Sequence, residues 1–183
     1  MFIILIGYMG SGKTSVGRLL SLILKRNFYD LDEIITNWKD QYIHNILLKN
    51  GENYLRIIEK YVLCFLKSIK KKIIIPSGGG IPCFNDNISS LNRIGITYYL
   101  HLSSKEIFQR IRYQKYKRPL ISCLSDDQLL FFIHKHLSNR IKYYNKSNYK
   151  IEIGNSFIEE IVFYIHNQLS LIHYRNGFVK KFK

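Results

Sequence analysis

Short apolar runs alternate along the chain with longer segments whose apolar residues recur at helical spacing. The runs at residues 2–6, 73–75 and 96–102 are typical of buried strands, and shorter strands are expected at 27–30 and 149–153. The spacing predicts helices over residues 15–25, 31–48, 55–69, 85–93, 103–112, 126–144 and 157–171. Because strands alternate with helices, we expect an α/β fold, a three-layer sandwich around a central parallel sheet of about five strands.

Individual positions sharpen this pattern. Gly51 should end the helical segment that begins at residue 31. The helix after it should bury one apolar stripe, made of Leu55, Ile58, Val62, Phe65, Leu66 and Ile69. Residues 113–125 are polar and lack a period, which is typical of a mobile loop. The last dozen residues, 172–183, form a basic and aromatic tail without a clear role.

Size and composition favour one globular domain over residues 1–183. No apolar run reaches the roughly 18 residues that a membrane span needs. The apolar start of the chain is too short for a signal peptide and lacks a basic leading region. The three cysteines are widely spaced and form no C-x-x-C pair, which argues against a disulfide scaffold or zinc site and fits a reducing cytoplasm.

The net charge of +15 raises the question of nucleic-acid binding. The lysines are scattered, however, with short runs only at 70–72 and 180–183, and the composition resembles a general bias. We therefore expect no specific nucleic-acid partner. A positive field would attract an anionic nucleotide and an anionic substrate.

The segment GYMGSGKT, from Gly7 to Thr14, adds specific chemistry to the pattern. It fits the phosphate-binding motif G-x-x-x-x-G-K-[ST] and lies between a buried strand and a helix, as that motif requires. Lys13 would reach the β- and γ-phosphates, and the Thr14 hydroxyl would bind Mg²⁺. The residues expected to bind ATP here are Gly10, Ser11, Gly12, Lys13, Thr14 and Ser15.

Four further features accompany this motif. Asp30 and Asp32 lie at the carboxyl end of the second strand, where ligands of such sheets bind. Arg56 and Glu59 are neighbours on one helix turn. A triple glycine, 78–80, follows the third strand, and its bare backbone would let a small ligand approach closely. Two later arginines complete the set, Arg118 in the polar loop and Arg140.

Together these features resemble the shikimate kinase family. The markers are GYMGSGKT, FYDLD, GENYLRIIE, SGGG, RPL and R-x-x-x-Y, in this order over most of the chain. The resemblance implies a fold like that of the nucleoside monophosphate kinases, with a substrate-binding helical segment at about 32–60 and a lid at about 113–125. It also implies ATP-dependent phosphorylation of the 3-hydroxyl of shikimate, with Mg²⁺, in a monomeric cytoplasmic enzyme of aromatic amino acid biosynthesis.

The resemblance also assigns roles to individual residues. Catalysis falls to Lys13, Asp32 and Arg118. Shikimate binding falls to Asp32, Arg56, Gly78, Gly79, Gly80 and Arg140. Arg118 would close over the ATP phosphates, and Asp30 would hold Mg²⁺ through water. Arg112 is assigned to ATP, with Arg110 as its competitor for the adenine contact.

Departures and alternatives remain. The family usually has Thr-Gly-x-Ser where this chain has residues 39–42, Phe where it has Leu55, and Glu where it has Lys146. Asp30 and Asp32 could instead be a helix cap and a surface acid, the Arg56–Glu59 pair a surface ion pair, and the glycines a flexible turn. The rival functions are a kinase of gluconate or of a nucleoside monophosphate, and a nucleic-acid-binding module.

Overall fold

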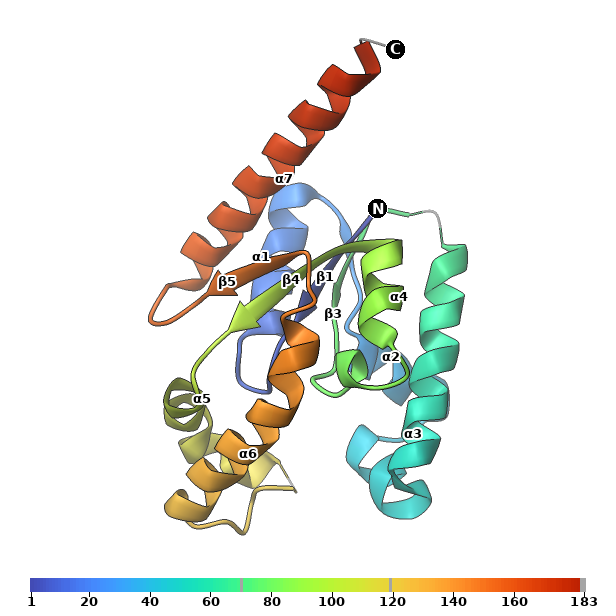
Figure 1. Cartoon of the computed structure of the whole chain (residues 1–183). Coiled ribbons are helices and arrows are strands. Elements are labelled where there is room, and N and C mark those ends of the chain that lie inside the picture. Colours follow the sequence, from blue (N-terminus) through green and yellow to red (C-terminus); the bar gives the residue numbers. More distant parts are fainter. Residues whose placement is uncertain (70, 119, 182–183) are drawn as a thin grey trace.

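Five parallel strands form one sheet in the order β2-β3-β1-β4-β5 (Figure 1). The computed structural model describes residues 1–69, 71–118 and 120–181, without the side chains of residue 117 and residues 173–181. The strands are β1 (Phe2–Ile6), β2 (Asn27–Phe28), β3 (Ile73–Pro76), β4 (Gly95–His101) and β5 (Tyr149–Glu152). The expected parallel sheet is confirmed.

The centre of the sheet is the most apolar part of the chain. Every residue of β1 is buried, and Ile3 pairs with Ile74 of β3 and with Ile96 of β4. A strand that is covered on both faces needs apolar side chains at every position, which explains the unbroken run FIILI. The phosphate motif therefore begins where a fully buried central strand ends.

Helices cover both faces of this sheet. They are α1 (Lys13–Leu24), α2 (Leu31–Lys39), α3 (Ile43–Ser68), α4 (Asn87–Ile94), α5 (Ser104–Ile111), α6 (Asp126–Tyr144) and α7 (Ile158–Lys181). Helices α1 and α7 pack together on one face, and α4 packs on β4 and α3 on the other (Figure 1). Helices α5 and α6 lie together beyond the carboxyl end of β4 (Figure 1).

The helix expected over residues 31–48 is wrong, because it is divided in two. Helix α2 ends at Lys39, and Asp40 adopts a left-handed conformation with φ of 50°. The chain resumes as α3 at Ile43, and Gly51 interrupts that helix with φ of 80° and ψ of 171°. The break predicted at Gly51 is therefore present, but an earlier one precedes it.

The apolar stripe of α3 is mostly confirmed. Leu55, Ile58, Val62 and Leu66 are buried, whereas Phe65 exposes 65% of its surface. Phe65 faces the boundary between α3 and α2, and the short α2 does not cover it. Whether Phe65 is buried depends on where α2 lies. The spacing of apolar residues within α3 does not predict the position of α2.

Regular structure is present in the segment expected to be a mobile loop and in the tail for which the sequence indicates no clear role. Within 113–125, a 3₁₀ helix named η2 covers Arg112–Lys117, and Ile121 is buried in the core. Helix α7 runs to Lys181, so the backbone of residues 172–181 continues the helix that was expected to end at 171. Within the described part of the chain, no helix has the length and apolar character to cross a membrane.

Candidate active site

The phosphate motif forms a tight loop between β1 and α1. Gly10 and Gly12 have φ of 79° and 85°, a backbone region that favours glycine. Gly12 is the N-cap of α1, so the free N–H groups of the helix start face the loop. Lys13 Nζ donates to Tyr8 O at 2.8 Å, which folds its side chain back over the loop. The arrangement suits a phosphate chain.

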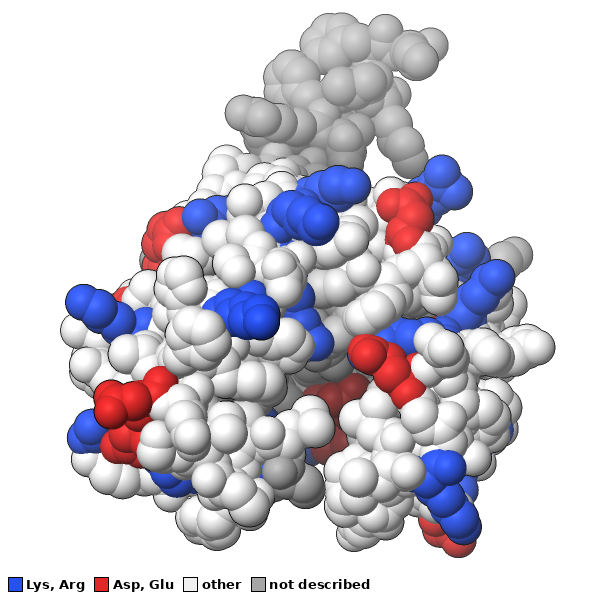
Figure 2. All heavy atoms as spheres, turned by 60° about the horizontal axis from the view of Figure 1, so that its bottom comes forward, with Lys and Arg blue, Asp and Glu red and all other residues white. Residues whose placement is uncertain are grey.

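A cavity of about 400 Å³ opens at the carboxyl ends of the strands, beside this loop. Figure 2 turns this end toward the viewer and shows a hollow with acidic atoms inside it and Lys and Arg side chains around it. Expected site residues that line the cavity are Gly10, Gly12, Lys13, Thr14, Ser15, Asp30, Asp32, Gly78, Gly79 and Arg118. Residues from four separate parts of the chain thus meet in one place.

Asp30 links the phosphate loop to α2. Its Oδ2 accepts a hydrogen bond from Thr14 Oγ1 at 2.9 Å, and its Oδ1 accepts one from the backbone N of Asp32 at 3.0 Å. The alternative in which Asp30 caps a helix is therefore correct, since it is the N-cap of α2. The same carboxylate nevertheless faces the cavity together with a hydroxyl. These two oxygen donors fit a hard cation such as Mg²⁺.

Asp32 projects from the first turn of α2 toward the triple glycine. A Cβ atom on Gly78 would collide with Asp32 Oδ1, so a larger residue there would displace this carboxylate. Asp32 is exposed to the open cavity, yet desolvation by the surrounding walls and the nearby Asp30 charge raise the pKa of its carboxyl to about 6, against the opposing charges of Lys13 and Arg56. Asp32 is therefore placed to accept a proton close to neutral pH.

Arg56 forms a buried network, and the alternative of a surface ion pair is wrong. Arg56 and Glu59 expose only 9% and 4% of their surfaces. Arg56 Nη1 donates to both carboxylate oxygens of Glu59 at 2.6 Å, and Nη2 donates to Glu52 at 2.6 Å. The guanidinium also lies 4.0 Å from the centre of the Phe84 ring. Its buried Nε has no hydrogen-bond partner among the described residues.

Arg140 reaches the same place from α6. Its Nη1 lies 3.5 Å from the position that a Cβ atom on Gly79 would take. Tyr144, one helical turn later, donates from its hydroxyl to Gly79 O at 2.6 Å. A Cβ on Gly80 would lie 2.8 Å from Arg56 Nη2. The three glycines thus face Asp32, Arg140 and Arg56 in turn.

The arginines near the lid occupy different surroundings. Arg118 lines the cavity, and its charge is one of those that lower the pKa of Lys13 to about 8, after the larger effect of burial. Arg112 does not line it and instead stacks on Tyr113, with 4.3 Å between its guanidinium carbon and the ring centre. Arg110 lines the cavity and donates to Gly154 O at 2.8 Å. The structure therefore brings Arg110, rather than Arg112, to the site.

The cavity is also lined by residues to which the sequence analysis assigned no role. They are Met9, Ser77, Ile111 and Gln114, whereas Arg110 had been considered for the adenine contact. Adjacency was the available signal for Ser77, because it directly precedes the triple glycine. The histidines were expected to be surface or packing residues, and the described residues contain no cluster of His, Cys, Asp or Glu that could hold a metal.

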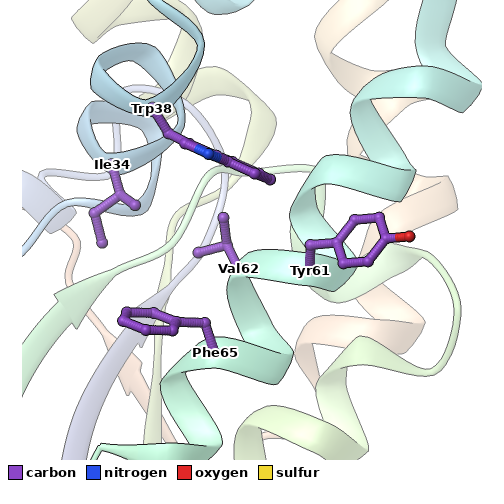
Figure 3. A pocket seen from close by; sticks show the side chains of 5 residues that line it. All are labelled: Ile34, Trp38, Tyr61, Val62 and Phe65. Carbon is purple, nitrogen blue, oxygen red and sulfur yellow. The ribbon is translucent and has the colours of Figure 1, made fainter.

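A second cavity, of about 450 Å³, lies between α2 and α3 and is apolar (Figure 3). Ile34 and Trp38 come from α2, while Tyr61, Val62 and Phe65 come from α3 (Figure 3). It contains none of the expected site residues.

Known proteins match this chain in sequence and in structure. The family model for shikimate kinase matches residues 9–170. Shikimate kinase of Bacteroides fragilis is 37% identical over 147 residues, which are 80% of this chain and 82% of that protein. The solved shikimate kinase of Bacteroides thetaiotaomicron has a TM-score of 0.85 at 30% identity and covers 93% of this chain and 98% of its own. That of Acinetobacter baumannii, in complex with shikimate, has a TM-score of 0.80 at 32% identity and covers 94% and 93%.

A more distant likeness concerns the fold alone. Deoxyadenosine kinase from M. mycoides has a TM-score of 0.57 at 16% identity. The expected nucleoside-kinase-like α/β fold is therefore confirmed. The family model spans most of the chain, and the similarity to the Bacteroides fragilis enzyme covers 80% of it. The chain belongs to the shikimate kinase family and is a kinase, a phosphotransferase that acts on a hydroxyl group.

Proposed function

We propose that this chain transfers the γ-phosphoryl group of ATP to the 3-hydroxyl of shikimate, with the cavity at the carboxyl ends of the strands as its active site. The hydroxyl oxygen attacks the γ-phosphorus, the bond from that phosphorus to the bridging oxygen breaks, and ADP leaves. Such reactions ask the protein chiefly for positioning and charge neutralisation. Both tasks can be assigned to named residues.

The phosphates of ATP would lie in the loop of residues 10–15, against the N-terminus of α1. Lys13 and Arg118 would neutralise the charge of the transferring group, since both line the cavity. Thr14 and Asp30 would hold Mg²⁺, Asp30 through water. The ion would supply further charge neutralisation on the phosphate oxygens. Arg110 is the better candidate for the nucleotide contact than Arg112, because it lines the same cavity.

Shikimate would bind over the triple glycine. Asp32 would orient the 3-hydroxyl and accept its proton, for which a pKa of about 6 is suitable. Arg56 and Arg140 would hold the carboxylate, because a guanidinium can donate paired hydrogen bonds that an ammonium cannot. Glu59 accepts from Nη1 of Arg56 and Glu52 accepts from Nη2, so both carboxylates fix the orientation of the guanidinium beside Gly80.

One observation carries this proposal. Gly78, Gly79 and Gly80 each lie against a different polar side chain: Asp32, Arg140 and Arg56 respectively. A carboxylate base and two arginines around bare backbone match a small acceptor that has both a hydroxyl and a carboxylate. Gluconate also has hydroxyls and a carboxylate, so the preference for shikimate over gluconate rests on the shikimate kinase match over residues 9–170.

Steady-state kinetics test the assignment. A coupled ADP-release assay on shikimate, gluconate and CMP should give turnover with shikimate alone. Arg56→Lys and Arg140→Lys should chiefly raise the KM for shikimate, since lysine keeps the charge and loses the paired geometry. Asp32→Asn should lower kcat far more than it changes the KM. If both lysine variants keep the wild-type KM for shikimate, the carboxylate clamp is wrong.

We also propose that residues 113–125 act as a lid and residues 32–60 as the substrate-binding segment of a single domain. Amide exchange in 113–125 should slow when ATP and shikimate bind, and an unchanged pattern would refute the lid. A monomer in the cytoplasm is expected, and three free cysteines agree with a reducing compartment. Size-exclusion chromatography with light scattering would detect any larger assembly.

A further inference from the structure

Tyr8, the second residue of the phosphate motif, has a side chain that leaves the loop and reaches α6. Its hydroxyl lies 2.8 Å from His136 Nδ1, across 128 positions of sequence. The two rings meet edge to face with 5.5 Å between their centres, and Phe132 packs on the other side of His136 at 5.0 Å. Tyr8 exposes only 1% of its surface. This is a defined contact between the loop and the helix.

The backbone of Tyr8 belongs to the phosphate site at the same time. Its carbonyl accepts hydrogen bonds from Lys13 Nζ at 2.8 Å and from Ser11 N at 3.2 Å. A shift of this residue would therefore move the carbonyl that holds Lys13. One residue joins the phosphate loop, through its main chain, to α6, through its side chain.

The same contact lies beside Arg140. His136 precedes Arg140 by one helical turn, and the Arg140 guanidinium carbon lies 5.9 Å from the centre of the Tyr8 ring. A guanidinium at this distance from an aromatic face is weakly attracted to it. Arg140 is thus set by the position of α6 and by the ring that the loop presents to it.

The protonation states suit a stable hydrogen bond. Burial raises the pKa of Tyr8 to about 12, with Arg140 opposing the rise, so the phenol keeps its proton. Burial and the Arg140 charge lower the pKa of His136 to about 4, against the opposing charge of Glu52. A neutral imidazole has one nitrogen that can accept. At neutral pH one hydrogen bond therefore joins the Tyr8 hydroxyl and Nδ1, and the tautomer of the neutral ring sets its direction.

We propose that Tyr8 and His136 are positioning residues for the acceptor substrate: their hydrogen bond holds α6 against the phosphate loop and sets Arg140 over Gly79. This inference rests on the proposed role of Arg140 in binding the shikimate carboxylate. The position of Arg140 then depends on the side chain of Tyr8, while the carbonyl of Tyr8 holds Lys13. The donor and acceptor sites are thus both held by Tyr8.

The experiment compares Tyr8→Phe, His136→Leu and the double variant. Tyr8→Phe keeps the buried ring and removes only the hydroxyl. One hydrogen bond contributes about 0.5–1.5 kcal/mol, so each single change should raise the KM for shikimate about 2- to 10-fold. The KM for ATP should stay near that of the wild type. The double variant should be no worse than the worse single, because both remove the same bond.

Two further variants separate positioning from general packing. His136→Asn keeps an acceptor at the δ position and should restore most of the shikimate KM. His134→Leu changes an exposed histidine two residues away on the same helix and should have no effect. Thermal unfolding by circular dichroism identifies any variant that has lost stability. A general loss of structure would also raise the KM for ATP, whereas a loss of positioning at Arg140 would not.

Arg140→Lys is measured beside them. If it raises the shikimate KM while Tyr8→Phe and His136→Leu do not, the inference is overturned and the carboxylate clamp stands. If Arg140→Lys itself has no effect, both the clamp and the inference fail. Equal increases in the KM for ATP and for shikimate, additive effects in the double variant, or no recovery with His136→Asn would each overturn the inference as well.

Discussion

The two halves of the cleft are built from different parts of the polypeptide. The donor half is mostly backbone: a glycine loop, the N-terminus of α1 and one lysine that bonds to the loop's own carbonyl. The acceptor half consists of charged side chains held by other side chains, with Arg56 gripped by Glu59 and Glu52. A continuous stretch of eight residues, Gly7 to Thr14, suffices for the first. The second draws on α2, α3, the triple glycine and α6.

This difference has consequences for tolerance to substitution. The donor half depends on the local conformation of the phosphate loop, so replacing its glycines or its lysine should impair it directly. The contacts that hold this half lie within the loop and the start of α1. A side-chain site depends on desolvated charges whose partners lie elsewhere on α3, so removing one partner leaves the other buried alone. Substitutions in the donor half should therefore act on turnover, and those at the arginines of the acceptor half and their partners on stability and acceptor binding.

The largest effect is expected at the donor half, from Lys13→Ala. Removing a cation that neutralises the transferring phosphoryl group should lower kcat on the order of 10²–10³-fold. The melting temperature should barely change, because among the described residues Lys13 Nζ bonds only to the loop that carries it, at Tyr8 O and Ser11 Oγ. Initial rates and circular dichroism check both parts. Turnover within about tenfold of wild type would contradict the role of Lys13.

Next in size is a contrast between the two glutamates that hold Arg56. Glu59→Ala leaves a buried guanidinium without its main partner and should reduce the free energy of unfolding by about 3 kcal/mol or more. Glu52→Ala should cost under about 1 kcal/mol, because the Glu52 side chain is 54% exposed to solvent. Urea titrations of both variants provide the comparison. Equal losses of unfolding free energy in the two variants would mean that the buried pair of Arg56 and Glu59 contributes no more to stability than the exposed pair of Arg56 and Glu52.

The pH dependence should separate the two halves in one measurement. Asp32 works ionised, so with a pKa of about 6 the value of kcat/KM should fall as the pH drops below 6. Lys13 works protonated, so with a pKa of about 8 the value should fall again above pH 8. Each limb should approach a tenfold loss per pH unit. A profile that stays flat down to pH 5 would remove Asp32 as the proton acceptor.

The smallest effect concerns the end of α2, the helix that carries Asp32. Asp40 has φ of 50°, which glycine adopts without strain, and it lies in the stretch where the family usually has Thr-Gly-x-Ser. Asp40→Gly should raise the free energy of unfolding by about 0.5–1 kcal/mol. Lys25, which caps α1 with the same φ of 50°, offers a matched Lys25→Gly variant. A destabilised Asp40→Gly protein would show that the aspartate side chain matters more than the backbone strain.

The same contrast explains how far sequence reasoning reached. The phosphate loop was predictable residue by residue, because its parts are adjacent and its flanking strand and helix have clear periods. Asp30, Asp32 and the triple glycine were predictable from their place after strands, where the carboxyl ends of a parallel sheet meet. Arg56 and Arg140 came from the family resemblance, and the structure brings both to the glycines.

What escaped prediction depends on contacts between distant segments. Helix α5 ends at Ile111 and η2 follows, so the chain turns and Arg110, not Arg112, faces the cavity. The exposure of Phe65 follows from where α2 lies, and the Tyr8–His136 bond joins positions 128 apart. The spacing of apolar residues along the chain does not predict contacts between segments that are far apart in the sequence.

The apolar groove between α2 and α3 has a practical consequence, because it contains Trp38, the only tryptophan of the chain. The indole exposes 54% of its surface and has Lys39 Nζ 4.2 Å from its ring centre. Helices α2 and α3 also carry Asp32 and Arg56. The tryptophan emission of the unlabelled protein therefore reports on the segment that flanks the acceptor site.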